Sequence, residues 1–346
     1  MCVIHLTQDV FGLIDNAPAV VRAHDILSEP IATVMQDRAP APGRVREFLR
    51  EEYQRAVRHE HWHVGIVDAP IQAFLDPGAD LEVKWFPLPG RGRYLADPFG
   101  LPRGSATDVL FEEFDFRSRE GAIAWVRVDS DGHVSDPQPA LEFPFHASYP
   151  YLVEREGAVY CVPETADGRE ASLYRAVEFP NRWTKEAILL PNVAALDNTV
   201  VEHDGRLWMF NTDKDDGPFS KLRIWYAPDL RGPWKPHAAN PVKTDIGSAR
   251  PAGTPFLHDG ELYRPAQDCS HGYGGSVVVN RVLRLTTTEY REERAAVITP
   301  FRDGPHRHGI HTLASAGGRT LVDGKRYGFN GWAMARNVFG SRETRL

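Results

Sequence analysis

The sequence predicts an all-β fold, a five-bladed β-propeller, from three observations. First, residues 201–213 read VEHDGRLWMFNTD and residues 256–268 read FLHDGELYRPAQD, so each copy has two strands around a shared HDG turn. Second, similar segments precede the copies, LYRAVEFPNRW at 173–183 and IWYAPDLRGPW at 224–234. Third, further strand–turn–strand units continue in both directions at intervals of roughly 50 residues, the length of one propeller blade. A single blade cannot bury its own faces, so such units are expected to stand side by side around an axis.

The opening strands of the units predict how many blades there are. They centre near Asp97, Ser148, Asp197, Arg250 and His311. Short strands separated by Gly and Asp turns are typical of antiparallel hairpins, and five openings indicate five blades. A β-sandwich is the alternative, because it also has short strands at regular spacing.

The first 60 residues differ from the repeats. Residues 43–60 carry apolar side chains at helical spacing, at Val45, Phe48, Leu49, Tyr53 and Val57. We therefore expect an extension over residues 1–60 with one amphipathic helix that serves packing, followed by the propeller over residues 61–346.

The ring of blades needs a closing strand, because closure removes open sheet edges. Two segments have the required strand character, Trp62 to Val67 and Tyr327 to Ala335. The sequence leaves the choice between them open.

Composition narrows the functional classes. The net charge of −7 argues against a nucleic-acid partner, which needs a basic surface stripe. No apolar run is long enough to span a membrane, and the amino end lacks the pattern of an export signal. Cys2, Cys161 and Cys269 are scattered and odd in number, which is typical of free thiols in a reducing compartment. We therefore expect a cytoplasmic protein.

Two aspartates occupy matching places on predicted inner strands. Asp97 lies in ADPFG and Asp197 in ALDNTVVEHDG. Asp and Pro are both depleted within strands, so packing explains ADP poorly. The alternative for each is an ordinary turn aspartate. On inner strands of non-adjacent blades, the two would face one another across the axis, and paired carboxyl groups are what glycoside cleavage needs.

Two further ionisable groups follow. Glu164 in VPETADG stands at a strand end and is a candidate general acid, because burial raises the pKa of a carboxyl; a solvated loop glutamate is the alternative. Arg250 in GSARPAGTPF is a candidate ligand for a carboxylate or phosphate of the substrate. Its alternative role is a structural ion pair with Asp97 or Asp197.

Polar and aromatic residues form a predicted substrate rim. Gln267, Asp268 and Tyr273 lie in RPAQDCSHGYGG, where amide, carboxyl and hydroxyl groups can bind sugar hydroxyls. Aromatic rings can stack on the apolar face of a sugar, and Trp62 is a candidate for that contact.

The segment RDGPHRHGIHTLAS contains His306, His308 and His311. The H-x-H-x-x-H spacing is compatible with a metal site, but no matching carboxylate motif accompanies it. We expect His308 and His311 to contact substrate instead. The sequence indicates no cofactor and no catalytic metal, and leaves open a structural ion in the central channel.

These motifs together resemble a known family. ADPFG, SYPYL, VPETADGREASLYRAVEFPNRW, LDNTVVEHDGRLWMF, SARPAGTPF, LYRPAQDCSHGYG and GIHTL, in this order, are similar to the amino-terminal domain of plant glucosamine inositolphosphorylceramide transferases and its stand-alone bacterial relatives. More remotely, the ADP and LDNT strands resemble those of five-bladed glycosidases of the family 43 and family 32 type.

The remote resemblance implies a catalytic set of two aspartates and a glutamate. Asp97 would be the base or nucleophile, and Asp197 and Glu164 would share the other roles. Two features depart from those glycosidases: Ser148 and Tyr149 stand where many of them have a second inner aspartate, which makes Tyr149 a candidate substrate contact, and Glu164 lies on the second blade instead of the third.

Two functions are therefore expected. The first is a glycosidase-like enzyme that cleaves or transfers a glycosyl unit of a saccharide or glycoconjugate, in polysaccharide or glycolipid metabolism. The alternative is a propeller that binds glycans without turnover in such an assembly pathway.

Overall fold

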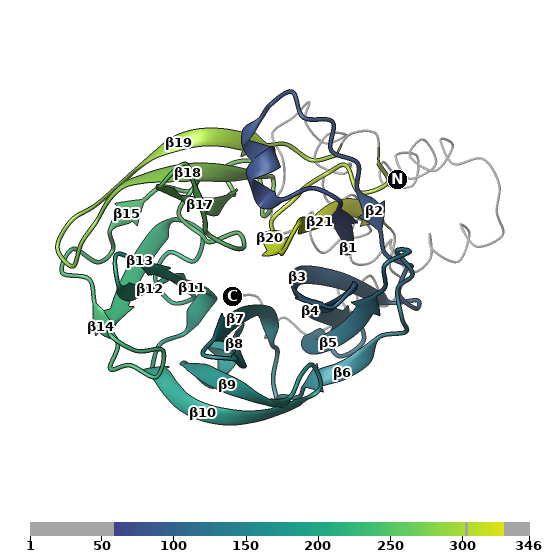
Figure 1. The fold of residues 1–346 in the computed structure, drawn as a ribbon, viewed down its shortest axis with the longest axis horizontal. Helices are drawn as coiled ribbons and strands as arrows, with labels where there is room; N and C mark the ends of the chain where they lie inside the picture. The colour runs from purple at the N-terminus through teal and green to yellow at the C-terminus, as the bar shows by residue number, and fades with distance from the viewer. Residues whose placement is uncertain (1–58, 302–303, 329–346) are drawn as a thin grey trace, which may run out of the picture. The chain divides into compact units, whose positions relative to one another are not determined.

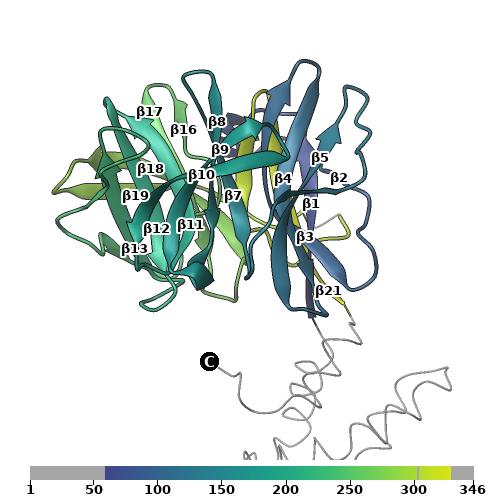
Figure 2. The ribbon, with the colours of Figure 1, turned by 90° about the horizontal axis from the view of Figure 1, so that it is seen from below.

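The protein forms five antiparallel sheets arranged as blades around a common axis (Figure 1). The structure, a computed structural model, describes residues 59–301 and 304–328. The five-bladed propeller predicted from the sequence is confirmed. Figure 2, turned by 90°, shows the strands of the first blade running side by side. The blades lie in one compact unit, Glu60–Tyr327.

The first three blades follow one another along the chain. The first contains β3 (Arg93–Arg103), β4 (Ala106–Asp115), β5 (Glu120–Val128) and β6 (Gln138–Leu141). The second contains β7 (Ser148–Arg155), β8 (Ala158–Glu164), β9 (Glu170–Glu178) and β10 (Arg182–Pro191). The third contains β11 (Ala195–His203), β12 (Arg206–Asp213), β13 (Lys221–Ala227) and β14 (Lys235–Pro236), with β15 (Lys243–Thr244) paired to β13.

The last two blades complete the ring. The fourth contains β16 (Phe256–His258), β17 (Glu261–Asp268), β18 (Ser276–Leu285) and β19 (Tyr290–Ile298). The fifth contains β20 (Leu313–Ala316) and β21 (Arg319–Gly328) together with β1 (His59–Val67) and β2 (Lys84–Trp85). Two short 3-10 helices, η1 (Ile71–Leu75) and η2 (Ala166–Gly168), lie in connections.

The strand β1 closes the ring. It is hydrogen-bonded between β2 and β21, so the segment from Trp62 to Val67 joins the last blade, as one of the two predicted alternatives has it. In the other, Tyr327 to Ala335, Tyr327 and Gly328 end β21, and the rest lies outside the described residues. The predicted helix over 43–60 also lies outside them, except that His59 and Glu60 begin β1.

The repeated HDG tripeptides are hairpin turns, as predicted. Asp204 and Gly205 join β11 to β12, and Asp259 and Gly260 join β16 to β17, all four with positive φ between 50° and 81°. Two successive left-handed residues match the right-handed twist of the flanking strands, and Asp and Gly tolerate this backbone best.

Apolar side chains fill the spaces between neighbouring blades. The largest cluster joins residues of blades five, one, two and three, and includes Val64, Phe99, Phe111, Tyr151 and Met209. Burial of each such side chain contributes about 1.5–3 kcal/mol. These side chains stabilise the ring and leave the strand segments nearest the axis to polar residues.

Candidate active site on the propeller axis

Three inner strands bend at an equivalent residue. Asp97, Tyr149 and Asp197 have φ of 51°, 44° and 53° and lie within the irregular register of β3, β7 and β11. Positive φ is uncommon outside glycine, and a bulge re-aims the side chain that it carries. In the segment that leads into β16, Gly253 has φ of 113°, so Arg250, on which the sequence centred that strand, lies three residues before this bend.

Asp197 is held by two partners from the fourth blade. The Arg250 guanidinium donates from Nε to Oδ2 at 2.6 Å and from Nη2 to Oδ1 at 3.2 Å. The Gln267 amide donates to Oδ2 at 2.9 Å. Arg250 is 8% exposed and Asp197 2%. The alternative role of Arg250, an ion pair with Asp197, is therefore present, and its two-point geometry fixes the carboxylate.

Glu164 lies at the end of β8, next to Asp197. Its Oε2 accepts the backbone N–H of Asp197 at 3.1 Å, and the Arg250 Nη2 lies 3.7 Å from the same oxygen. Burial raises the pKa of Glu164 well above its usual range, and the charge of Asp197 adds to the shift while Arg250 opposes it. These surroundings favour the protonated form of Glu164, which is buried and not a solvated loop glutamate.

Asp97 is 4% exposed and faces the fifth blade. Its Oδ1 accepts the Thr312 hydroxyl at 2.9 Å and lies 3.7 Å from Nε2 of His311. Burial raises the pKa of Asp97 to about 6, His311 counteracts the shift, and Asp197 and Asp323 add to it. The carboxyl therefore ionises within the neutral range, as a general base or nucleophile requires.

Asp323, on β21, was not predicted from the sequence. Its Oδ1 accepts the backbone N–H groups of His311 and Thr312 at 2.9 and 3.0 Å. Its Oδ2 accepts the N–H of Asp97 at 3.2 Å and lies 2.5 Å from Nδ1 of His311. Asp97, His311 and Asp323 have potential metal-ligand atoms within 4.8 Å of one another. Both oxygens of Asp323 are engaged by backbone N–H groups and by the ring of His311, and Nε2 of His311 lies 3.7 Å from Oδ1 of Asp97.

Glu112, on β4, is a second carboxyl that the sequence analysis missed. It is 5% exposed, and its Oε1 has no hydrogen-bond partner among the described residues. The nearest cation-forming atom is Nε2 of His146 at 3.8 Å. Burial raises the pKa of Glu112 well above its usual range, and the charges of Asp97 and Glu164 raise it further. Glu112 therefore belongs to the same electrostatic cluster.

Glycine at position 121 makes room for this carboxyl. A Cβ there would lie 2.3 Å from Oε1 of Glu112 and 2.8 Å from the carbonyl oxygen of Ala147. The N–H of Gly121 donates to Nδ1 of His146 at 2.9 Å, which places the proton of a neutral His146 on Nε2, toward Glu112.

The Glu112→Gln variant tests the burial of this carboxyl. A raised pKa in the folded state means that the stability contributed by protonated Glu112 is complete below the unfolded pKa and is lost as pH rises through the folded pKa. We expect the free energy of unfolding of Glu112→Gln to fall less between pH 5 and 8 than that of the wild type. Glu113→Gln is the control and should retain the wild-type slope: Glu113 follows Glu112 on β4, and its carboxylate pairs with Arg93 of β3. Equal slopes in all three proteins would contradict the burial of Glu112.

Aromatic rings stand beside the carboxyl cluster. Trp62, on β1, stacks on His311 with ring centroids 3.8 Å apart and planes 7° apart. Tyr273 meets Trp62 edge-on at 5.9 Å, and its ring lies 5.2 Å from the Arg250 guanidinium. Phe219, 38% exposed and absent from the predicted set, lies over the same guanidinium at 5.5 Å. Trp62 and Tyr273 thus lie within the candidate site.

The predicted substrate contacts Tyr149 and Asp268 make hydrogen bonds within the protein. Tyr149 is fully buried, and its hydroxyl bonds to Thr199 at 2.8 Å and to the N–H of Gly253 at 2.7 Å. Asp268 is half-buried and accepts the N–H of Ser270 at 3.0 Å. Tyr149 therefore ties three blades together, whereas Gln267 contacts the carboxyl cluster directly.

The three histidines of the H-x-H-x-x-H segment do not converge. His306 lies against Trp85 with ring centroids 4.6 Å apart, and the exposed His308 lies against Tyr327 at 5.2 Å. Only His311 reaches the carboxyl cluster. Cys161 and Cys269 are free thiols, and Cys2 lies outside the described residues.

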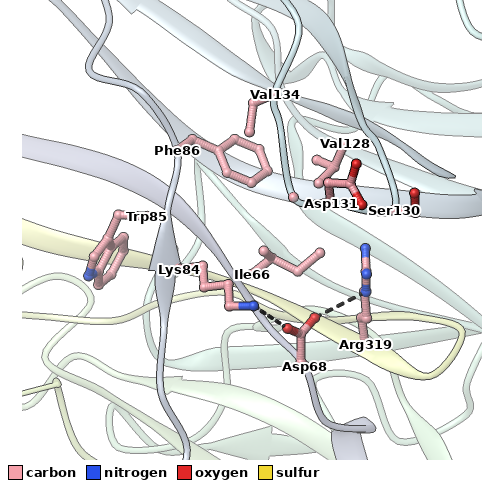
Figure 3. Close-up of a pocket in the computed structure, with 11 residues that line it drawn as sticks. Ile66, Asp68, Lys84, Trp85, Phe86, Val128, Ser130, Asp131, Val134 and Arg319 are labelled. Atoms are coloured by element: carbon pink, nitrogen blue, oxygen red, sulfur yellow. Dashed lines mark hydrogen bonds and ion pairs between the residues drawn. The ribbon is translucent and has the colours of Figure 1, made fainter.

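A pocket on another part of the propeller involves none of the predicted site residues (Figure 3). Its lining includes Asp68, whose carboxylate pairs with Lys84 at 2.6 Å and Arg319 at 3.1 Å, and the turn at Asp131. Lys84 and Arg319 already pair with the Asp68 carboxylate in this pocket, so the carboxyl groups on the axis are the better candidates for catalysis.

A sequence model of the amino-terminal region of glucosamine inositolphosphorylceramide transferase 1 matches residues 88–305. The chain belongs to this family. The matched range of the family contains Asp97, Glu112, Glu164, Asp197 and Arg250. The resemblance stated from the motifs is thereby confirmed.

Curated members of this family come from plants. The chain is 34% identical over 262 residues to glucosamine inositolphosphorylceramide transferase 1 of Oryza sativa subsp. japonica, covering 71% of this chain and 35% of the relative. It is 34% identical over 253 residues to the Arabidopsis thaliana protein of that name, covering 67% and 32%. The chain therefore spans about a third of the length of the curated relatives it matches.

Solved structures with a similar chain path include glycoside hydrolases. Zg3597, a family 117 glycoside hydrolase of Zobellia galactanivorans, has a TM-score of 0.47 at 13% identity and covers 68% of this chain and 84% of its own. CoXyl43, a family 43 β-xylosidase/α-arabinofuranosidase from a compost metagenome, has 0.47 at 11%, covering 62% and 80%. At these values no residue role transfers from them. Among the described residues of this chain, no helix has the length and apolarity to cross a membrane.

Proposed function

We propose that this propeller is a glycosidase-like enzyme that cleaves or transfers a glycosyl unit through its axial carboxyl groups. The observation that carries the proposal is the contrast between two buried carboxyls. Asp97 has a pKa of about 6, whereas the pKa of Glu164 is raised well above its usual range. Two carboxyls whose environments separate their pKa values are suited to act as base and acid in one reaction.

In this proposal Glu164 protonates the departing glycosidic oxygen, and Asp97 acts on the other side as base or nucleophile. Glu164 keeps its proton because it is buried beside Asp197. Asp97 loses its proton more readily because it faces His311 and accepts the Thr312 hydroxyl.

Asp197 has a positioning role. Both of its oxygens are engaged by Arg250, and Gln267 adds a third hydrogen bond. A carboxylate so occupied is a poor nucleophile but a fixed negative charge, and that charge raises the pKa of Glu164. Arg250 then acts through Asp197, and its predicted contact with an anionic group of the substrate becomes a secondary role.

The saccharide partner is also part of the proposal. Tyr273 and Phe219 place aromatic rings next to the carboxyl cluster, where the apolar face of a sugar can stack. Trp62 is 3% exposed and supports this surface from beneath by stacking on His311. The name of the plant relatives joins glucosamine to inositolphosphorylceramide, so glucosaminides are the first glycosides to test.

Binding of a glycan without turnover is the second candidate. This function is favoured because the carboxyl groups already have hydrogen-bond partners within the protein. Asp197 accepts three hydrogen bonds from Arg250 and Gln267, and Asp97 accepts one from Thr312. A wild-type protein that binds glucosaminides and turns over none of the glycosides tested would support this candidate.

The Glu164→Gln variant tests the acid role. We expect turnover of alkyl glycosides, whose departing alkoxide needs a proton, to fall by about 10²–10⁴-fold, the usual contribution of general acid catalysis. Turnover of glycosyl fluorides should change much less, because fluoride departs without a proton from a carboxyl group. Glu154→Gln is the matched control and should behave as the wild type, because Glu154 lies on the same blade as Glu164 and forms a surface ion pair with Arg103 of the first blade. An equal loss on both classes of substrate would argue against Glu164 as the acid.

A further inference from the structure

Asp323, His311 and Asp97 lie in a row, and contacts with the backbone fix the orientation of the Asp323 carboxylate. Asp323 is fully buried and accepts three backbone N–H groups, from Asp97, His311 and Thr312. The carboxylate of Asp323 cannot rotate without losing these hydrogen bonds. Its Oδ2 lies 2.5 Å from Nδ1 of His311, so the proton between them belongs to the Nδ1 side of the ring.

The imidazole ring of His311 is equally constrained. It is 2% exposed, stacks on Trp62 at 3.8 Å and meets Tyr273 edge-on at 5.1 Å. The backbone closes over it, because the N–H of Ile310 donates to the Gly274 carbonyl at 3.0 Å and a Cβ at Gly274 would lie 3.0 Å from Cβ of His311. With Nδ1 directed to Asp323, the ring therefore presents Nε2 toward Oδ1 of Asp97, 3.7 Å away.

We propose that Asp323 and His311 form a dyad that keeps Asp97 ionised, so that His311 is a positioning residue that acts through Asp97. The proposal rests on the proposed function, in which Asp97 is the base or nucleophile. The proton on Nδ1 stays with the ring, a second proton on Nε2 makes the ring a cation, and that cation lies between two carboxylates. No bond to substrate is formed by His311.

The surrounding charges favour this arrangement. Burial works against a charged His311, but Asp323 and Asp97 outweigh it and raise the pKa of the ring, with a further contribution from Asp197. The ionisable groups packed around the ring and Asp97 are Asp323 and Lys325 on β21, Asp197 on β11, Glu112 on β4, Glu164 on β8, and Tyr273. The Lys325 ammonium lies over the ring of Trp62 at 5.1 Å.

Titration of the histidine rings by nitrogen-15 NMR tests the dyad without any substrate. In the full chain labelled at histidine, His311→Gln identifies the His311 signals. The wild type should show a pKa for His311 above 6.5, and Asp97→Asn should lower it by about one unit or more, as loss of an opposite charge within 4–6 Å does. Asp323→Asn should lower it further. Asp108→Asn, whose buried carboxylate pairs with Arg127, is the control and should leave it unchanged. A His311 pKa that is the same in Asp97→Asn and wild type would overturn the proposal.

A kinetic arm separates failure of this inference from failure of the proposed function. With an active glycoside, His311→Gln should shift the acidic limb of kcat/KM upward by about one unit, because Asp97 loses a neighbouring cation. His133→Gln, on an exposed turn, should leave the limb in place. Loss of turnover in Asp97→Asn together with an unmoved limb in His311→Gln would sink the dyad alone. Full turnover in Asp97→Asn would sink the proposed function, while the NMR result would still decide the dyad.

Discussion

The Asp97→Asn variant is expected to lower turnover of glycosides by at least about a thousand-fold and to leave the fold intact. The amide cannot accept a proton or attack the anomeric carbon, and loss of a general base or nucleophile has effects of this size. The backbone is preserved because Asn tolerates positive φ as well as Asp does, and Asp97 has φ of 51°. Steady-state kinetics and thermal unfolding of the same preparation measure the two effects.

Asp259→Asn is a matched control for this variant. Asp259 also has φ of 51°, but its side chain is 89% exposed at the turn between β16 and β17. The same substitution in the same backbone conformation should therefore leave both turnover and melting temperature unchanged. Wild-type turnover in Asp97→Asn would remove Asp97 from the mechanism.

Arg264→Met is expected to lower the free energy of unfolding by about 3 kcal/mol, because the buried carboxylate of Glu292 loses its buried partner and keeps Lys243 and Tyr290. Arg264 and Glu292 are 0% and 3% exposed and are joined by hydrogen bonds of 2.7 and 3.0 Å. Arg264 also donates to the carbonyl oxygens of Ser248 and Ala249, directly before Arg250. The substitution should thus loosen the segment that holds Asp197, and denaturant unfolding measures the loss.

Two comparisons make this stability test specific. Arg281 and Glu293 join the neighbouring strands β18 and β19 at the surface, with side chains 40% and 51% exposed, so Arg281→Met should cost less than about 1 kcal/mol. The double variant Arg264→Met with Glu292→Leu should recover much of the loss, because it removes the buried carboxylate as well. Equal losses for Arg264→Met and Arg281→Met would show that burial of the first pair is unimportant.

The blade repeat could be predicted from the sequence because each unit repeats its strands and turns at a similar interval. Asp97 and Asp197 were found for the same reason: they occupy one position of that repeat, in a strand that otherwise disfavours aspartate. The ion pair of Arg250 with Asp197 was one of two open alternatives, because a sequence cannot show whether an arginine near the axis faces a carboxylate of its own chain or a ligand.

Glu112 and Asp323 were missed although the repeat contained a signal for Glu112. Glu112 faces Ala96 and Glu164 faces Ser148 in the strand registers, so both glutamates stand opposite the residue that precedes a left-handed bend. Their neighbours differ, FEEF in one case and VPET in the other, which hid the match. Asp323 had no counterpart to indicate it, because its role depends on backbone N–H groups that only the folded chain brings together.

The pH dependence of kcat/KM between pH 4 and 9, measured on a glycosyl fluoride, tests the central claim most directly. A fluoride needs no proton for departure, so the rate should report ionisation of the base alone. We predict that kcat/KM rises as pH increases through about 6, the pKa of Asp97, and then stays level. A profile that is flat from pH 5 to 8, or that falls across this range, would contradict an axial carboxylate as the base.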